Sequence, residues 1–355
     1  MLQVSFYSYK GGAGRSTTSW NTIQRLVKDE KWKPTVKNPF VIVDTDTESA
    51  GSTFLYNANR FFYMNKKFAS VQKRMTDSGG IIYTSSSASS EKEEFFKGMY
   101  PIGRFFGLPE TEENSVLLIG ANLHKTSASE ASVSEDDVKA KEQIKNFHNN
   151  ITVACRACGA KALFFDTPSG TQFLARRSIW ESNIVVCCMR PTSQFREGTR
   201  GQLINFIKDE AERGIERKYI LTPTAVCIDA GQTFSVNGKP RLYPGEAKKA
   251  IIDEFNAETL EEENEKTVQA YKKNVILDML EPTPKEIKEK NKYFESDDND
   301  SVFGIPEIKR FKWYEACLGK ILEEGGELTS NDQMAINRYE YLAQTIIKCH
   351  KMINS

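Results

Sequence analysis

A glycine-rich segment near the start of the sequence carries the residue types best suited to binding phosphate. Residues 8–18 read SYKGGAGRSTT; they follow the apolar run 4–7 and lead into a helical pattern over 20–27. A loop between a strand and a helix turns its backbone N–H groups toward an anion, and the helix N-terminus adds a positive dipole. Glycine allows both the tight turn and the close approach of a phosphate. The segment therefore predicts a phosphate-binding loop, with Lys10 at its front and Arg15 near its end.

Two acidic motifs follow apolar runs further along the chain. The run 40–43 leads into Asp44 and Asp46, which are spaced by one residue, and the run 162–165 leads into Asp166 and the residues TPSG. Alternation along a strand would place Asp44 and Asp46 on the same side. Carboxylates are oxygen ligands for magnesium, so these acids are candidates for a metal site. An isolated Asp at a strand end fits a helix cap equally well, and the preceding loop is what favours the metal site here.

The loop resembles the deviant Walker A phosphate loop of the ParA/MinD-type P-loop ATPases of the SIMIBI class. Their pattern is Lys-Gly-Gly-x-Gly-Lys-Ser/Thr-Thr/Ser, and this chain matches every position except the second lysine, which is Arg15. The acidic motifs at Asp44-x-Asp46 and at Asp166 match later motifs of the same family. The resemblance implies an α/β fold with a doubly wound, mostly parallel sheet flanked by helices, carrying helical insertions.

The resemblance also implies roles for individual residues. ATP phosphates would be bound by Gly11, Gly12, Ala13, Gly14, Arg15, Ser16 and Thr17, and Mg²⁺ by Ser16, Asp44 and Asp166. Asp46 would help position the attacking water. Lys10 would reach the phosphates of the partner in a nucleotide-sandwich homodimer, as an arginine finger does in other enzymes. Arginine is bulkier than lysine and planar, so it is not an equivalent replacement for the loop lysine, but it can bind phosphate bidentately. The sequence therefore leaves open whether ATP is hydrolysed slowly or is bound without hydrolysis.

The resemblance continues to the end of the chain. Further strands are expected over residues 183–189 and 218–222, and helices over 193–206, 311–322 and 334–347, the last with apolar residues at helical spacing. Gly198 and Thr199 stand where the family often has a small residue. Thr222 and Pro223 occupy the place where the family often has an asparagine that contacts the base, which leaves adenine specificity open.

Residues 1–355 are expected to form a single P-loop ATPase domain, because the loop and both acidic motifs must meet at one site. Insertions are expected over 54–110 and 230–300. The first is rich in aromatic residues, which fit either extra helices on the sheet edge or a partner-binding surface. The second is charge-dense and fits solvated helices.

Bulk composition restricts the classes of function. The 48 basic and 48 acidic residues give a formal net charge of zero, which is unlike a dedicated nucleic-acid binder. Seven cysteines without a signal-peptide pattern lead us to expect a cytoplasmic protein. Cys155 and Cys158 form a C-x-x-C pair that we interpret as free thiols rather than half of a metal site. No apolar run approaches the roughly 20 residues that span a bilayer.

Two uses of the ATPase are kept open. The first is plasmid or chromosome partition or another positioning of cargo, in which an ATP-dependent homodimer binds DNA non-specifically; the candidate basic residues are Lys309, Arg310, Lys312, Lys348 and Lys351. The second is a regulatory or defence-associated ATPase, or a near-inactive nucleotide-binding protein, that acts through an adaptor protein. Binding to a membrane ranks last, because residues 344–355 have few bulky apolar side chains.

Overall fold

The structure is a computed structural model, and it describes residues 1–46, 49–58, 96, 99–121, 138–171, 173–227, 233–236, 239–242, 245–260, 263–288, 303–312 and 317–355. The chain divides into two compact units, each described by itself below. The first unit contains Met1–Tyr7 and Leu26–Asn183, and the second contains Ser8–Arg25 and Ile184–Ser355. The organisation into one ATPase domain stays a prediction.

The strands of the first unit lie in the order β1-β5-β2-β4-β3. Their bounds are β1 Leu2–Tyr7, β2 Phe40–Asp44, β3 Tyr100–Pro101, β4 Val116–Ile119 and β5 Ala162–Asp166. All pairs are parallel except the edge pair β3 and β4. Strands β1, β2, β4 and β5 are buried along their whole length, as expected for parallel strands that read as continuous apolar runs.

Helices cover this sheet and complete a core. The first unit holds α2 (Gly51–Leu55), η1 (Gly103–Phe106), η2 (Glu110–Ser115), α6 (Val138–Ala157) and α7 (Phe173–Trp180). Apolar side chains of β2, β4 and β5 pack with Ile151, Ala154 and Cys155 of α6 in one cluster. Because the sheet presents an apolar face, the amphipathic helix α6 stabilises it by burying its own apolar stripe there.

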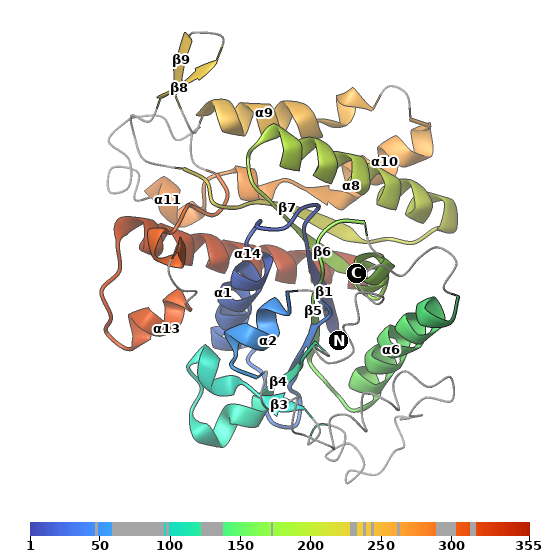
Figure 1. The fold of residues 1–355 in the computed structure, drawn as a ribbon, viewed down its shortest axis with the longest axis vertical. Helices are drawn as coiled ribbons and strands as arrows, with labels where there is room; N and C mark the ends of the chain where they lie inside the picture. Colours follow the sequence, from blue (N-terminus) through green and yellow to red (C-terminus); the bar gives the residue numbers. More distant parts are fainter. Residues whose placement is uncertain are drawn as a thin grey trace. The chain divides into compact units, whose positions relative to one another are not determined.

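The second unit contains the parallel strands β6 (Ile184–Met189), β7 (Lys218–Pro223) and β10 (Val275–Ile276), in the order β10-β7-β6. A separate antiparallel pair joins β8 (Thr233–Val236) and β9 (Lys239–Leu242). The other elements are α8 (Ser193–Arg213), α9 (Gly245–Phe255), η3 (Ala257–Thr259), α10 (Glu265–Asn274), η4 (Asp278–Leu280), α11 (Pro284–Lys288), η6 (Lys309–Lys312), α13 (Leu318–Glu323) and α14 (Ser330–Asn354). Helix α8 runs along one side of β6 and β7, with α9 and α10 against it, and α14 runs along the other (Figure 1).

Helix α1 (Arg15–Lys28) begins inside the glycine-rich segment, and its residues up to Arg25 belong to the second unit. The expected strand at 40–44 and the expected closing helix both form; the helix is longer than predicted, and Tyr339, Leu342, Ile346 and Ile347 on it are buried. The helix expected over 311–322 is confined to Leu318–Glu323 among the residues described there. Residues 309–312 form the 3-10 helix η6, and residues 313–316 of the expected helix lie outside the described residues.

The two predicted insertions are described only in part. Around 54–110 the structure contains the edge strand β3 and the helix η1, where Phe105 and Phe106 pack against Tyr56; the run 59–95 lies outside the described residues. Around 230–300 it contains the β8–β9 pair and helices α9 to α11, and 289–300 lies outside. No helix in the described part of the chain has the length and hydropathy needed to cross a membrane.

None of the seven cysteines forms a disulfide bond, and the interpretation of Cys155 and Cys158 stays a prediction. Six of them are buried, and Cys227 is half-buried. Burial raises the pKa of Cys155 well above its usual value, and it raises the pKa of Cys317 to about 11. These thiols therefore stay protonated at neutral pH and behave as small apolar side chains.

Candidate functional site

The glycine-rich loop of the second unit has a main chain that depends on glycine. Gly12 and Gly14 have φ values of +79° and +71°, in the left-handed region. A Cβ added at either residue would meet no atom within 4 Å. Backbone conformation, rather than crowding by the protein, is therefore what requires glycine at both positions.

Three basic side chains surround this loop within the second unit. The Lys10 ammonium donates to Gln194 Oε1 of α8 at 2.6 Å. The Arg15 guanidinium reaches back to Ser8, with Nη1 3.2 Å from Oγ. Arg190, the residue after β6, donates from Nε to the carbonyl oxygen of Gly12 at 2.9 Å. Positive charge on both arms of the loop suits an anionic ligand.

Gly198, the small residue predicted within α8, lies directly against an aromatic ring. A Cβ added at Gly198 would lie 2.1 Å from ring carbons of Tyr9, the residue just before Lys10. The aromatic ring therefore fills the space that any other side chain on this turn of α8 would occupy. Glycine in a helix interior costs about 1 kcal/mol relative to alanine, and here it allows the loop entrance to lie close to the helix.

The acidic residues of the first unit meet at the carboxyl ends of neighbouring strands. Asp44 ends β2 and Asp166 ends β5, and the two are direct partners in the parallel register. Both are buried. Asp44 Oδ2 accepts from the backbone N–H and from the hydroxyl of Thr53, each at 2.7 Å, and Asp166 Oδ2 accepts from the Ser52 hydroxyl at 2.7 Å. Helix α2 thus supplies neutral donors that fix both carboxylates.

This pair has the electrostatics of a cation site. Burial, followed by the charge of Asp166, raises the pKa of Asp44 to about 8, although the hydrogen bonds from Thr53 act to lower it. Two adjacent buried carboxyl groups also favour a divalent cation, and hard oxygen donors are the ligands that Mg²⁺ prefers. The residues present therefore fit magnesium.

Asp46 lies just beyond the end of β2 and is held by its own loop. Its backbone N–H donates to Asp44 Oδ1 at 3.1 Å. Its two carboxylate oxygens accept from Ser49, one from the backbone N–H at 3.0 Å and the other from the hydroxyl at 2.6 Å. The structure therefore brings the two acids of the Asp-x-Asp motif together, and both are buried.

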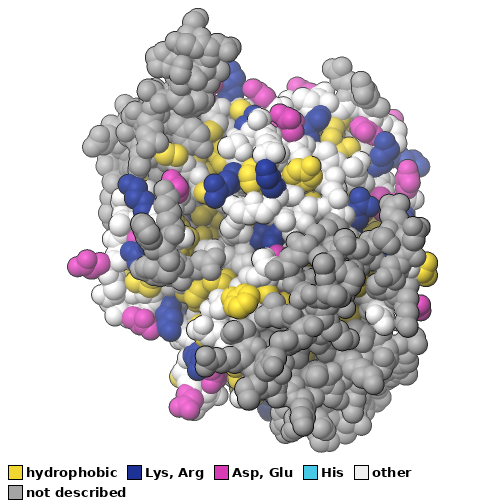
Figure 2. Space-filling model, viewed as in Figure 1, with side chains coloured by type: hydrophobic (Ala, Val, Ile, Leu, Met, Phe, Trp, Pro, Cys, Tyr) yellow, Lys and Arg dark blue, Asp and Glu magenta, His cyan; other side chains and the backbone are white. Residues whose placement is uncertain are grey.

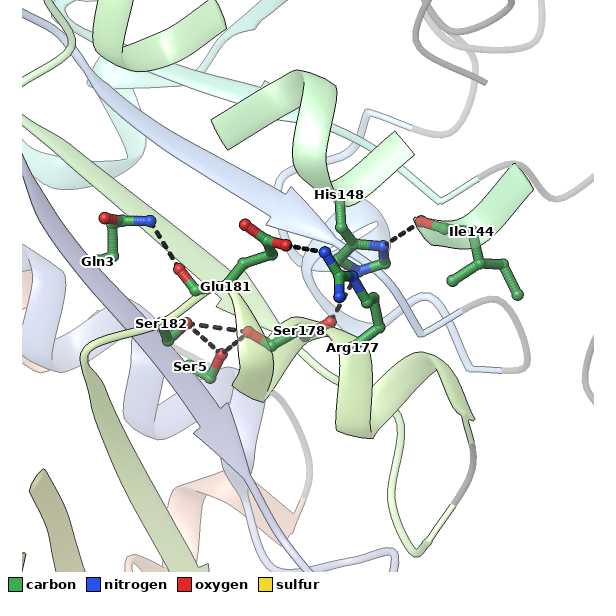
Figure 3. Close-up of polar contacts among 8 residues, drawn as sticks. All are labelled: Gln3, Ser5, Ile144, His148, Arg177, Ser178, Glu181 and Ser182. Carbon is green, nitrogen blue, oxygen red and sulfur yellow. Dashed lines mark hydrogen bonds and ion pairs between the residues drawn. The ribbon is translucent and has the colours of Figure 1, made fainter. Parts of the chain in front are cut away.

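A buried polar network joins α6 and α7 in the first unit, and Figure 3 draws its residues Ile144, His148 and Ser178. Ser178 of α7 bonds through Oγ to His148 Nε2 at 3.0 Å and to Thr45 Oγ1 at 3.1 Å. His148 Nδ1 faces the carbonyl oxygen of Ile144 at 2.9 Å, so this nitrogen carries the proton of the neutral ring. Burial lowers the pKa of His148 to about 4. The network is therefore neutral at physiological pH, and it ties α6 and α7 to the residue between the two acids.

Two of the basic residues proposed for DNA binding are engaged within the second unit. Arg310 pairs with Asp332 at 2.7 Å, and Lys348 pairs with Asp278 at 2.9 Å. Lys and Arg side chains are interspersed with Asp and Glu on the face drawn in Figure 2. Neither observation describes a continuous basic field of the kind that tracks a nucleic-acid backbone.

Four residues with a place in these clusters were not identified from the sequence. Ser52 and Thr53 bind the carboxylates, and Arg190 and Thr224 bind the loop. The available signals were weak: two hydroxyl residues shortly after the Asp-x-Asp motif, a basic residue directly after the apolar run 184–189, and a threonine three positions after the apolar run 219–221. Such positions are polar in many loops, so only the structure distinguishes them.

No protein-family model matches the sequence, and no curated protein matches it either. Among solved structures, cobyrinic acid a,c-diamide synthase from Mycobacterium smegmatis with bound ADP and magnesium is similar, with a TM-score of 0.52 and 12% identity over 99% of this chain and 96% of that one. The septum site-determining protein MinD from Pyrococcus horikoshii OT3, complexed with Mg-ADP, matches with a TM-score of 0.45 and 12% identity over 96% of both chains. A plasmid partition protein from Borrelia burgdorferi matches with a TM-score of 0.38 and 15% identity over 76% of this chain and 95% of that one. The first likeness, together with the mostly parallel strands, confirms the predicted α/β fold class with a doubly wound, mostly parallel sheet.

Proposed function

We propose that this chain is an ATP-binding, slowly hydrolysing dimerisation switch of the ParA/MinD type. The observation that carries the proposal is the glycine-rich loop at the start of α1, with positive φ at Gly12 and Gly14 and with Lys10 and Arg15 beside it. The buried carboxylates at the ends of β2 and β5 support it, because they fit Mg²⁺. The similar synthase structure contains ADP and magnesium.

In this proposal the backbone N–H groups of residues 11–16 donate to the phosphates of ATP, and Arg15 contacts the β- and γ-phosphates. Ser16 and Asp166 would hold Mg²⁺, with Asp44 near them, and the bound ion would supply positive charge to offset that of the phosphate oxygens. Asp46 orients the water that attacks the γ-phosphorus, and the products are ADP and phosphate. Lys10 reaches the phosphates bound by the partner in a homodimer.

Calorimetry of the purified full chain with ATP and Mg²⁺ tests the central claim. We expect saturable binding that weakens at least tenfold when Mg²⁺ is replaced by EDTA. Ser16→Ala and Asp166→Asn should remove most of the magnesium dependence, and Ser19→Ala is a matched control on the same helix. Undetectable ATP binding would overturn the proposal.

The role of Lys10 is tested by measuring ATP binding and ATP-dependent dimerisation separately. Lys10→Ala should leave ATP affinity within about threefold, because the residue serves the partner's site, and should reduce ATP-dependent dimerisation in analytical ultracentrifugation by tenfold or more. Lys28→Ala removes an exposed lysine of α1 and is the control. A loss of ATP affinity equal to the loss of dimerisation would place Lys10 in its own subunit's site instead.

The use of the switch has two candidates. Partition or positioning of cargo on DNA requires ATP-dependent, salt-sensitive binding to non-specific duplex. Arg310 and Lys348 are two of the candidate DNA-binding residues, and each forms an ion pair with an acidic residue of the second unit. These ion pairs favour action through an adaptor protein, because they use charges that would otherwise bind DNA phosphates. A gel-shift assay with ATP over a salt series decides between them: a shift that disappears between 50 and 200 mM salt supports DNA, and no shift at 50 mM supports the adaptor.

A further inference from the structure

The carbonyl oxygens of the phosphate loop are held from outside the loop, within the second unit. The Arg190 Nε–H donates to Gly12 O at 2.9 Å. The Thr224 hydroxyl donates to Ala13 O at 2.8 Å and lies 3.2 Å from Met189 O. A hydroxyl has one hydrogen, and Met189 O already accepts from the Thr224 backbone N–H at 2.8 Å, so the hydroxyl hydrogen serves Ala13.

The two holding residues come from neighbouring strands. Arg190 directly follows β6, and Thr224 directly follows β7 (Figure 1). They lie 178 and 211 positions from the carbonyls they bind. Two further carbonyls of the loop are held locally, because Ser8 Oγ donates to Lys10 O at 2.9 Å and the Thr18 N–H donates to Gly14 O at 2.9 Å.

These bonds set the direction of the loop's N–H groups. In a trans peptide the carbonyl of one residue and the N–H of the next lie in one plane and point in opposite directions. Holding Gly12 O therefore turns the Ala13 N–H away from Arg190, and holding Ala13 O turns the Gly14 N–H away from Thr224. The two bonds select one orientation in a segment whose glycines would otherwise allow several.

The geometry points to Arg190 and Thr224 as positioning residues that hold the loop ready for phosphate, a role that rests on the proposed nucleotide-binding function. Neither residue needs to touch the ligand for this. Each acts by fixing a peptide plane before the ligand arrives, which removes an ordering cost from binding. The Arg190 bond uses the rigid Nε–H of the guanidinium, which a lysine lacks.

Measuring nucleotide affinity distinguishes positioning of the loop by Arg190 and Thr224 from a simple attraction between the Arg190 charge and the phosphates. The probe is Mg-ADP, titrated by calorimetry into the full chain, so that dimerisation does not enter the readout. Thr224→Val and Arg190→Met should each weaken binding about tenfold, the effect of losing one well-placed hydrogen bond and the order it imposes. Thr224→Ser should restore the affinity, whereas Arg190→Lys, which keeps the charge, should bind as weakly as Arg190→Met.

Amide hydrogen exchange of residues 11–16 in the ligand-free protein is the second readout. It should be severalfold faster in Thr224→Val and Arg190→Met, while the thermal unfolding midpoint stays close to that of the parent. Thr222→Val is the matched control, because the buried Thr222 hydroxyl donates within its own strand to Ile220 O at 3.2 Å. Arg200→Met is the control for loss of an arginine, since Arg200 bonds Thr259 instead.

The results distinguish the proposed nucleotide-binding function from the proposed positioning role of Arg190 and Thr224. If the parent protein does not bind Mg-ADP, the proposed function fails, and the exchange experiment still tests whether the loop is held. If the parent binds and the Thr224→Val and Arg190→Met variants bind equally well with unchanged exchange, only the positioning role is overturned. Full recovery of affinity in Arg190→Lys would also overturn it, because charge alone would then suffice.

Discussion

Each unit contains a buried pair of ionisable side chains: two groups of opposite charge in the second unit and two carboxyl groups in the first. In the second unit Arg338 of α14 and Glu286 of α11 form a buried ion pair, with Nη2 and Oε2 2.9 Å apart. Arg338 also donates to Glu281 O at 2.6 Å, and Glu286 accepts from the Thr283 N–H that begins α11. In the first unit Asp44 and Asp166 are register partners of the same charge, and the hydrogen bonds to Asp44 come from neutral donors.

The difference separates a structural use of buried charge from a functional one. The Arg338–Glu286 pair neutralises itself and is complete within the fold, although burial lowers the pKa of Arg338 despite the opposing charge of Glu286. The carboxylate pair raises the pKa of Asp44 and would gain from an added cation. A buried pair of like charges is therefore a stronger indication of a binding site than a buried ion pair.

The largest effect is expected from breaking the ion pair. Arg338→Met leaves Glu286 buried without its partner, and it should lower the free energy of unfolding by about 4 kcal/mol in urea denaturation. Adding Glu286→Gln should recover most of this loss, because glutamine is neutral and still caps α11 with Thr283. A single-variant loss below about 1 kcal/mol would mean that the pair is not structural.

A third buried ionisable group, His148 of the first unit, is neutral in the folded protein and needs no partner of opposite charge. Its pKa falls from 6.5 to about 4 on folding. Between these pH values the unfolded chain binds the proton and the folded chain does not, so stability falls as the pH is lowered from 6.5 to 4. The size of this effect is about 3 kcal/mol in the free energy of unfolding.

The measurement compares the parent with His148→Gln in urea denaturation at several pH values. The variant should lose about 3 kcal/mol less than the parent over this window, because glutamine does not titrate. His350→Gln is the comparison variant: burial also lowers the pKa of this partly exposed histidine near the end of α14, so it should reduce the pH dependence in the same direction but by less than His148→Gln does. Equal pH dependence in the parent and in His148→Gln would show that His148 is not neutral and buried in solution.

The smallest effect is expected from removing one of the like charges. Asp44→Asn should change the free energy of unfolding of the ligand-free protein by less than about 2 kcal/mol, because two effects oppose each other. The amide avoids the cost of burying a carboxyl group with a raised pKa, but its single oxygen leaves the N–H of Asp46 or of Thr53 without an acceptor. Thermal unfolding with ADP should also lose its response to added Mg²⁺. A destabilisation above about 2 kcal/mol would place this pair with the structural ones.

The sequence predicts the local parts of this architecture well. Apolar runs ending in an acid become β2 and β5 with the expected bounds, and the glycine-rich segment does lead into a helix. These features depend on neighbouring residues, which a single sequence displays. Of the helix expected over 311–322, the described residues form the end of η6 and most of α13; residues 313–316 lie outside them, so where this helix starts stays a prediction.

The parts that escaped prediction depend on distant residues. Arg190 and Thr224 bind carbonyls about 200 positions away, and nothing local in the sequence distinguishes them from other polar residues after a strand. The contacts of Ser52 and Thr53 with the acids require the turn from β2 into α2, which includes Ala50 at a positive φ of 45°. Roles of the individual site residues stay predictions until the binding experiments are done.

The buried cysteines make it possible to follow the opening of each unit without an introduced label. Cys155 and Cys158 belong to the first unit, whereas Cys187, Cys188, Cys317 and Cys349 belong to the second. A protonated, buried thiol reacts with an alkylating reagent only after local or global unfolding. Mass spectrometry of the labelled peptides over time would therefore give separate opening rates for the two units, and the change in each rate with ADP would report which unit the nucleotide stabilises.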